Sequence, residues 1–353
     1  MKKTFVFAAM AALVSLVSCN KEATTPSIPQ AEKASLYVSV VSGTSMTKAT
    51  GTVNTTSAEY QTADEQKINN LQVFVFSGDA RDGYASVDNK DNAQVSCTAG
   101  SRDVYCLVNA PTSLNSIVSK TALLAAVSEL KEDGDNFEMI GKKEAQTIAS
   151  TGDTQIEVPV NRLAAKIVVK GIKNSLKTGK ALTVKRVFIS NVAGQINYGL
   201  TTYSPAAGKW YNKGGYKSAS GANLGSFTQD VELSASVNNG SSYTTNHYFY
   251  AYPNNYAQAN YAETWAPKRT MLVIQIESEG KLYDYPIDLG VDLASNKMYV
   301  VNTVVLENLG NDDDGGEGGK DEEDPIVGST VKVSVDVVDW DLVLLGTSGD
   351  ITI

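Results

Sequence analysis

The feature that most constrains the fold is a series of short apolar segments separated by turn-forming residues. The segments are rich in Val, Ile, Tyr and Phe, and stretches of Gly, Asn, Ser and Asp lie between them. Such spacing is typical of β-strands and disfavours a regular alternation of strands and helices. The sequence therefore predicts an all-β protein with little helix, built from β-sandwiches. The strands expected are 36–41, 71–76, 95–97, 104–108, 155–160, 165–169, 183–190, 247–252, 271–278, 282–287 and 299–307.

Two local patterns add detail to the first half. Apolar residues at 123, 124, 127 and 130 have helical spacing, which predicts one short amphipathic helix over 121–130. Segments 95–97 and 104–108 flank Gly100 and are expected to pair as a hairpin. Cys97 and Cys106 would face each other in only one register of that hairpin, because a one-residue shift moves them to opposite faces. A disulfide and two buried free thiols therefore stay open as alternatives.

The N-terminal leader predicts export and lipidation. Lys2 and Lys3 precede an apolar run over 4–17, which has the length of a signal peptide and is short for a membrane span. The run ends in Leu-Val-Ser-Cys, which resembles the lipobox of bacterial lipoproteins, in which the cysteine is acylated and becomes the mature N-terminus. Cys19 is the lipidation site expected from this resemblance. The alternative is an ordinary secretory signal with a cysteine near its cleavage point.

Composition and charge narrow the classes of function. The net charge is −9, with no basic cluster to offset phosphate repulsion, which disfavours nucleic-acid binding. The chain has a single histidine, His247, which leaves no second imidazole for a triad or for a site with several histidine ligands. The glycine pairs lack the Lys-Ser or Lys-Thr of a phosphate loop. We expect no catalytic, cofactor-binding or metal-binding residues, and a protein that is not an enzyme.

The C-terminal region combines an acidic segment with an apolar end. Residues 311–324 are Gly-rich and acidic and predict a solvated linker; a calcium loop is the sharper alternative, although no frame fits the EF-hand pattern. Valines alternate over 331–337, as in a strand of the protein's own second domain. At 337–338 the apolar residues change from odd-numbered to even-numbered positions, which predicts a bulge or a crossing between sheets. The apolar residues that follow need burial, and they are Trp340, Leu342, Leu344, Ile351 and Ile353.

A set of motifs in a fixed order resembles the fimbrillins, the lipoprotein-derived subunits of type V pili. Pro253 departs from the family pattern, which usually has Glu there. The motifs are the strand KINNLQVFVF at 67–76, the segment 97–110 ending in Val-Asn-Ala, NFEMIG at 136–141, NRLAAK at 161–166, FYAYPN at 249–254, the strand starting NKMYVV at 296–306, and VDVVDW at 335–340.

The resemblance implies a domain layout. Each of two domains would be a transthyretin-like Greek-key β-sandwich with minor helix. The expected segments are a lipoprotein signal peptide at 1–19, a removable propeptide with the first strand at 20–48, an N-terminal domain at 49–161, a C-terminal domain at 162–340 with the acidic linker at 311–324, and a donor-strand tail at 341–353.

The resemblance also implies a route of assembly. In the family, a trypsin-like protease cuts the loop after the first strand, and the C-terminal strand of a neighbouring subunit fills the groove left behind. Lys48 is the single basic residue of the loop 43–63, so the cut is expected between Lys48 and Ala49, where the family often uses Arg. The displaced strand would present Leu36, Val38 and Val40. The donor residues expected are Trp340, Leu342, Leu344, Ile351 and Ile353.

The sequence therefore predicts a structural subunit of a cell-surface pilus that supports adhesion. Its expected partners are copies of itself or related pilus subunits, the maturation protease, and outer-membrane lipid through acylated Cys19. Its location would change from the outer membrane to an extracellular fimbrium. Two alternatives stay open: a non-polymerising surface lipoprotein of the same fold, serving as anchor or adhesive tip, and a glycan-binding or hydrolytic lipoprotein suggested only by the Tyr-rich second half. The apolar tail argues against a tip.

Overall fold

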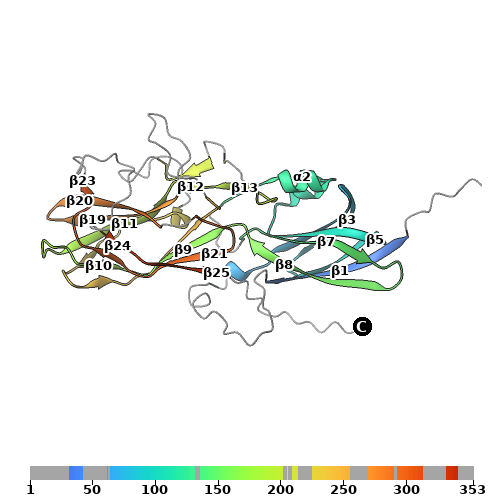
Figure 1. The fold of residues 1–353 in the computed structure, drawn as a ribbon, viewed down its shortest axis with the longest axis horizontal. Coiled ribbons are helices and arrows are strands. Elements are labelled where there is room, and N and C mark those ends of the chain that lie inside the picture. Colours follow the sequence, from blue (N-terminus) through green and yellow to red (C-terminus); the bar gives the residue numbers. More distant parts are fainter. Residues whose placement is uncertain are drawn as a thin grey trace, which may run out of the picture.

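The protein consists of two β-rich lobes arranged end to end (Figure 1). The computed structural model describes residues 32–42, 62, 64–131, 136–201, 205, 209–213, 225–254, 269–289, 292–312 and 331–340. Strands dominate both lobes, and the described part contains one short α-helix, on the flank of the N-terminal lobe. The all-β prediction is confirmed. None of the helices in these ranges is long and apolar enough to cross a membrane.

One seven-stranded sheet builds the N-terminal lobe, in the order β3-β2-β5-β7-β8-β1-β4. Three strands separate β2 from β1 in this order, yet both contribute to one aliphatic core, so the sheet curls into two layers. The other face of β2 carries Phe74 and Phe76 into a second core, so this strand is covered on both faces. The strands are β1 (Lys33–Ser42), β2 (Asn70–Ser77), β3 (Ala80–Asp88), β4 (Asn92–Thr98), β5 (Gly100–Val108), β7 (Met139–Ile148) and β8 (Asp153–Arg162).

The hairpin expected around Gly100 does not form. β4 pairs with β1, whereas β5 pairs with β2 and β7. Their burial explains the separation: β4 alternates between buried and exposed residues, while β5 is buried at nearly every position from Val104 onward. The two strands therefore belong to different layers, and Gly100, with φ of 113°, turns the chain between them.

The helix is shorter than its apolar spacing predicted. α2 spans Lys120–Ala125, and the side chain of Ser119 caps it by accepting a hydrogen bond from the Ala122 N–H (3.1 Å). The chain then becomes extended as β6 (Val127–Glu129), which pairs with β13 (Gln195–Asn197) of the C-terminal lobe. Val127 and Leu130 therefore belong to a strand contact between the lobes, which the helical pattern could not indicate.

The C-terminal lobe is a sandwich of two layers. One layer consists of two sheets, β18-β9-β21-β25 and β17-β10-β22-β24, and each strand of the first sheet is next in chain order to the strand at the same place in the second. The other layer is the sheet β15-β11-β19-β20-β23, in which β16 also pairs with β11. Its longer strands are β9 (Ala165–Val169), β11 (Leu182–Ser190), β18 (His247–Ala251), β19 (Met271–Ser278), β20 (Lys281–Asp288), β21 (Lys297–Val301) and β25 (Val335–Asp339). The remaining short strands of this lobe are β10 (Ile172–Asn174), β12 (Val192–Ala193), β14 (Trp210–Tyr211), β15 (Gln229–Asp230), β16 (Ala235–Val237), β17 (Ser242–Tyr243), β22 (Val304–Leu306), β23 (Asn311–Asp312) and β24 (Val331–Lys332). The described part also contains three short 3-10 helices, η1 (Asp64–Gln66) and η2 (Thr112–Ser116) earlier in the chain and η4 (Gly225–Phe227) in this lobe.

The last strands lie in the C-terminal lobe, with one difference from expectation. β25 pairs with β21 in unbroken register from Val335↔Val301 to Asp339↔Lys297, so neither the bulge nor the crossing between sheets predicted at 337–338 lies there. The interruption lies earlier, at 333–334, between β24 and β25. Val337 breaks the alternation because it lies on an edge strand and is 46% exposed. Asn311 and Asp312, counted in the expected linker, pair as β23 with β20.

Candidate functional site: the first strand and the lobe junction

β1 lies inside the N-terminal sheet, with a strand on each side. It runs parallel to β8 from Ser35↔Asp153 to Ser42↔Val160, and antiparallel to β4 from Lys33↔Thr98 to Ser39↔Asn92. β8 pairs with β7 only near the junction, over its last residues 160–162. We call the space that β1 occupies between β8 and β4 the slot. Removal of β1 would leave unpaired backbone on both of its walls.

Apolar burial and backbone pairing hold β1 in the slot. Leu36, Val38 and Val40 are at most 1% exposed and belong to the aliphatic core of the lobe. Tyr37 points outward and is 38% exposed. At the surface, Gln94 Nε2 donates a hydrogen bond to Ser35 Oγ (2.7 Å). The inward contacts are thus ones that another strand with alternating apolar residues could reproduce.

A polar clamp fixes the outer end of β4 independently of β1. Asp82 Oδ2, on β3, accepts hydrogen bonds from the Thr98 N–H and Oγ–H (both 2.8 Å) and from Arg102 Nε of β5 (2.7 Å). Arg102 Nη2 also donates to the Ala99 carbonyl (2.9 Å). Burial raises the pKa of Asp82, but the bonds from Arg102 and Thr98 outweigh it and leave the pKa below its usual value. β4 is therefore tied to β3 and β5 by contacts that do not involve β1.

A buried ion pair lies at the junction between the lobes. Lys166 Nζ of β9 lies 2.6 Å from Glu65 Oε1 of η1, and the Tyr250 hydroxyl of β18 donates to the same oxygen (2.7 Å). The Lys166 and Glu65 side chains are at most 1% exposed. Burial lowers the pKa of Lys166, and the Glu65 carboxylate opposes this shift. Burial is also the first cause that raises the pKa of Tyr250, so its hydroxyl stays a donor.

Trp340, the last described residue, is held beside this pair. Arg162 Nη1 donates to the Trp340 carbonyl and Nη2 to the Glu65 carbonyl, both at 2.8 Å. The guanidinium lies 4.5 Å from the centroid of the Trp340 ring, and Phe137 meets that ring edge-on at 5.2 Å. The Trp340 N–H donates to the Asn296 carbonyl (3.0 Å), and Asn296 Oδ1 accepts from the Arg162 N–H (3.1 Å). We call Glu65, Arg162, Lys166, Tyr250, Asn296 and Trp340 the junction cluster.

The structure places the predicted site residues in three groups. Leu36, Val38 and Val40 lie in the slot as described above. Cys97 and Cys106 are buried free thiols on β4 and β5, and burial raises the pKa of both. Trp340, predicted as the start of the donor, lies fully buried in its own chain. The remaining predicted residues lie outside the described part of the chain, and they are Cys19, Lys48, Ala49, Leu342, Leu344, Ile351 and Ile353.

Sequence reasoning missed the junction cluster, although its motifs contained most of it. Arg162 and Lys166 belong to NRLAAK, Tyr250 to FYAYPN, and Trp340 to VDVVDW. The residue that no motif contained is Glu65, the partner of Lys166, and it is remote from Lys166 in sequence. A basic pair at the start of an apolar strand was the available signal, because buried charges need partners.

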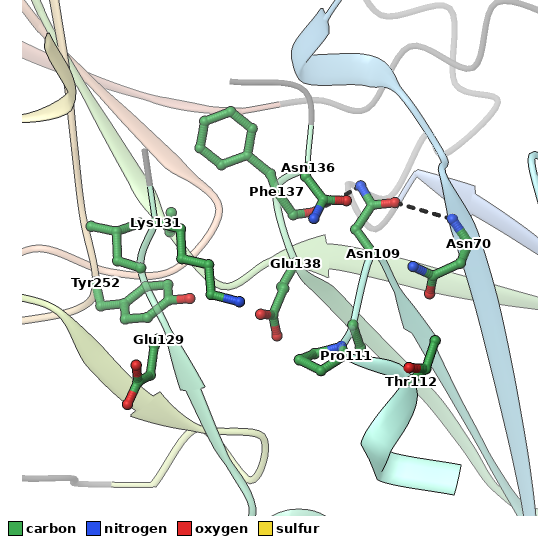
Figure 2. A pocket seen from close by; sticks show the side chains of 13 residues that line it. Asn70, Asn109, Pro111, Thr112, Glu129, Lys131, Asn136, Phe137, Glu138 and Tyr252 are labelled. Carbon is green, nitrogen blue, oxygen red and sulfur yellow. Dashed lines mark hydrogen bonds between the residues drawn. The ribbon is translucent and has the colours of Figure 1, made fainter. Parts of the chain in front are cut away.

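A polar cavity of about 240 Å³ also opens at the junction (Figure 2). Asn109, labelled in Figure 2, holds the surrounding backbone: its Oδ1 accepts from the Asn69 N–H (2.8 Å) and its Nδ2 donates to the Lys67 and Phe137 carbonyls (2.9 and 3.1 Å). Glu138 accepts from the Tyr198 hydroxyl, and burial raises its pKa. The side chains of Asn109 and Glu138 thus bond to the protein itself.

Comparison with known proteins identifies the relatives of this arrangement. Residues 34–186 match the family model of the major fimbrial subunit protein FimA. The resemblance to the fimbrillin family is confirmed. The matched range starts inside β1 and ends inside β11, so it includes the slot and the first part of the junction cluster. No curated protein matches the chain.

Solved structures share the fimbrillin fold over nearly their whole length. A fimbrilin from Porphyromonas gingivalis has 14% identity and a TM-score of 0.57, with 89% of this chain and 99% of that chain covered. A candidate cell adhesion protein from Bacteroides eggerthii has 21% identity and a TM-score of 0.58, with 88% and 97% covered. The tip fimbrial protein Mfa3 of Porphyromonas gingivalis, truncated at its C-terminus, has 12% identity and a TM-score of 0.51, with 87% and 100% covered. At these identities the likeness shows a shared fold.

Proposed function

We propose that this protein is a structural subunit of a surface fimbria, assembled by replacing β1 with a strand from another subunit. The observation that carries the proposal is the place of β1, an internal strand near the N-terminus that is bonded on both sides and filled with aliphatic side chains. The subunit would travel to the outer membrane as a lipoprotein acylated at Cys19. A trypsin-like protease would then cut between Lys48 and Ala49 and release β1.

The energetics favour a replacement strand over an empty slot. Each large apolar side chain gains about 1.5–3 kcal/mol on burial, so the three inward residues of β1 account for roughly 5–9 kcal/mol before entropy. Backbone hydrogen bonds to two walls add about 0.5–1.5 kcal/mol each. A donor with alternating apolar residues recovers both terms, which is strand addition to a sheet. The tail 341–353 carries two apolar pairs, Leu342 with Leu344 and Ile351 with Ile353, and each pair has the spacing of one strand face.

The clamp at Asp82 supports a slot that keeps its shape. β4 has β1 as its sheet partner, and without other contacts it would collapse onto β8 once β1 left. The bonds from Thr98 and Arg102 to Asp82 hold its outer end in place. A persistent slot lets an incoming strand bind without first separating two paired strands.

Limited proteolysis tests the proposal. The non-lipidated body starting at residue 20 should be cut by trypsin after Lys48, as read by mass spectrometry, and should then form multimers that resist dodecyl sulfate. A Lys48→Gln variant, which lacks the cleavage site, should stay monomeric. A variant without residues 341–353 should be cut and yet form no ladder. Ladders from this truncated variant would contradict strand donation by the tail.

A further inference from the structure

We propose that the side chains of Lys166 and Glu65 condense to an amide, which would be a covalent bond at the junction between the two lobes. Glu65 lies on η1, shortly before β2 of the N-terminal lobe, and Lys166 lies on β9 of the C-terminal lobe. The proposal does not depend on strand exchange, because β1 takes no part in it. Three features of the ion pair support it: its close contact, its burial, and the difference between its two carboxylate oxygens.

The close contact brings the amine to the carbon that it would attack. Lys166 Nζ lies 2.6 Å from Glu65 Oε1. Because the bond from Oε1 to the carboxyl carbon is about 1.2 Å long, Nζ lies at most about 3.8 Å from that carbon. Oriented groups held about 3–3.5 Å apart react as if present at about 10⁵–10⁸ M. Arg162 holds η1 in this position, since its Nη2 donates to the Glu65 carbonyl (2.8 Å).

Burial favours the amide over the ion pair. Both side chains are at most 1% exposed. The ring centroids of Tyr248, Tyr250 and Trp340 lie 4.7, 5.6 and 5.7 Å from the ammonium nitrogen. Condensation removes two buried charges, which are costly even when they are paired. Burial also lowers the pKa of Lys166, which increases the fraction of the neutral amine that attacks. Hydrolysis of an amide in water is favoured by solvation of the two ions that it releases, and this site withholds that solvation.

The two carboxylate oxygens of Glu65 differ in a way that suits the reaction. Oε1 accepts hydrogen bonds from Lys166 Nζ and from the Tyr250 hydroxyl (2.7 Å). Oε2 is buried and accepts no hydrogen bond from the described residues. A donor held against Oε1 stabilises the negative charge that develops there when the carboxyl carbon is attacked. Oε2 is the leaving atom, and its departure removes a buried acceptor that lacks a donor.

The reaction balances without a further reactant. The Lys166 ammonium transfers one proton to Oε2 of Glu65, and the neutral amine then attacks the carboxyl carbon, with charge developing on Oε1. The bond from carbon to Oε2 breaks, and Oε2 takes a second proton from the nitrogen and leaves as water. The nitrogen keeps its third hydrogen as the amide N–H. Tyr250 starts and ends protonated, and its hydroxyl acts only as a hydrogen-bond donor to Oε1.

The bond would close residues 65–166 into a covalent loop. This loop contains β2 to β8, whereas β1 lies outside it. Tension between the two ends of the chain would pass through the amide and would not extend the strands inside the loop. A linked subunit could still release β1, so the amide is compatible with the proposed assembly.

Mass spectrometry of the wild-type protein tests the proposal. The non-lipidated body starting at residue 20 should have, after denaturation, a mass lower than its sequence predicts by one water molecule. Complete tryptic digestion should yield a branched peptide in which residues 49–67 are joined to residues 163–170, because trypsin does not cut after an acylated Lys166. The full mass, together with free cleavage after Lys166, would overturn the proposal.

An exposed ion pair of the same protein is the control for burial. Lys209 Nζ lies 2.9 Å from Glu129 Oε2, but the two side chains are 37% and 41% exposed. Water solvates both charges there, so this pair should stay unlinked and trypsin should cut after Lys209. Linkage of both pairs to the same extent would overturn the argument from burial.

Two tyrosine variants test the role of the hydroxyl on Oε1. Tyr250→Phe should slow linking about 10²-fold, as measured on protein sampled over time from cell-free synthesis. Tyr248→Phe is the matched control and should link at the wild-type rate, because the Tyr248 hydroxyl accepts a hydrogen bond from Asn246 Nδ2 (3.2 Å) and its ring is kept. Equal rates for the two variants would overturn the role assigned to Tyr250.

Discussion

The slot and the junction cluster are held by opposite kinds of interaction. β1 contributes aliphatic side chains and backbone hydrogen bonds, and its inward residues belong to a purely apolar core. The junction, in contrast, buries a Lys–Glu pair, an arginine and the Trp340 ring, each oriented by specific partners. Apolar pairing is tolerant of sequence, whereas buried charges are costly unless each finds its partner.

This difference bears on the proposed strand exchange. The contacts of β1 in the slot are apolar side chains at alternate positions and backbone pairing, which other strands can also make. The junction accepts no such substitute, because Glu65 and Trp340 are each fixed by named contacts. Two segments of the proposed assembly route adjoin the junction. η1 follows the loop 43–63, where the cleavage is expected, and Trp340 precedes the expected donor tail. In the proposed exchange, the junction cluster is the part of the subunit that would keep its contacts.

The largest effect is expected from Glu65→Ala at the junction. This change leaves the Lys166 ammonium buried without its carboxylate, and breaking a buried pair in this way costs about 3–5 kcal/mol of unfolding free energy. Urea denaturation followed by circular dichroism measures the loss. Asp64→Ala is the matched control, since the Asp64–Lys67 pair (2.9 Å) has side chains that are 63% and 47% exposed. Its loss should stay below about 1 kcal/mol. Equal losses would mean that the junction pair is no more important than a surface pair.

A second prediction distinguishes the two states of the subunit. Leu36→Ala should destabilise the precursor by about 2–5 kcal/mol, because it opens a cavity in the aliphatic core. The matured polymer should melt at the wild-type temperature, since residue 36 has been removed from it. Val73→Ala of β2, in the same core, should lower both transitions and is the control. A polymer that Leu36→Ala also destabilises would show that β1 is retained.

The strands that could be predicted were those defined by their own composition. The expected strand 271–278 coincides with β19, and 71–76 lies within β2, because a run of apolar residues fixes a buried strand locally. Strand pairing could not be predicted in the same way. β4 and β5 look like a hairpin in sequence, but burial on both faces of β5 sends the strands to different layers.

The candidate site shows the same division. The slot residues Leu36, Val38 and Val40 were predictable, because alternation alone marks an inward face. The ion pair of Glu65 with Lys166 was not, because no local pattern reports a partner so distant in sequence. Trp340 was expected among the donor residues, because it shares an apolar register with Leu342 and Leu344. Only the contacts with Arg162 and Asn296 show that it belongs to the junction.

The smallest expected effect concerns the clamp, which is polar like the junction but lies at the outer end of the slot. Asp82→Asn removes the charge that accepts from Thr98 and Arg102, whose bonds to a charged group contribute about 1.5–3 kcal/mol at most. The Asp82 pKa is lower in the folded protein than its usual 3.8, so its contribution is full above that value and is lost as the pH falls through the folded pKa. Unfolding free energies measured from pH 5 down to pH 2 should therefore fall more steeply for the wild type than for Asp82→Asn. Parallel curves would show that the carboxylate does not carry the clamp.

In matured protein lacking residues 341–353, the same variant should also speed amide hydrogen exchange in β4, because β4 then has neither β1 nor the clamp to hold it.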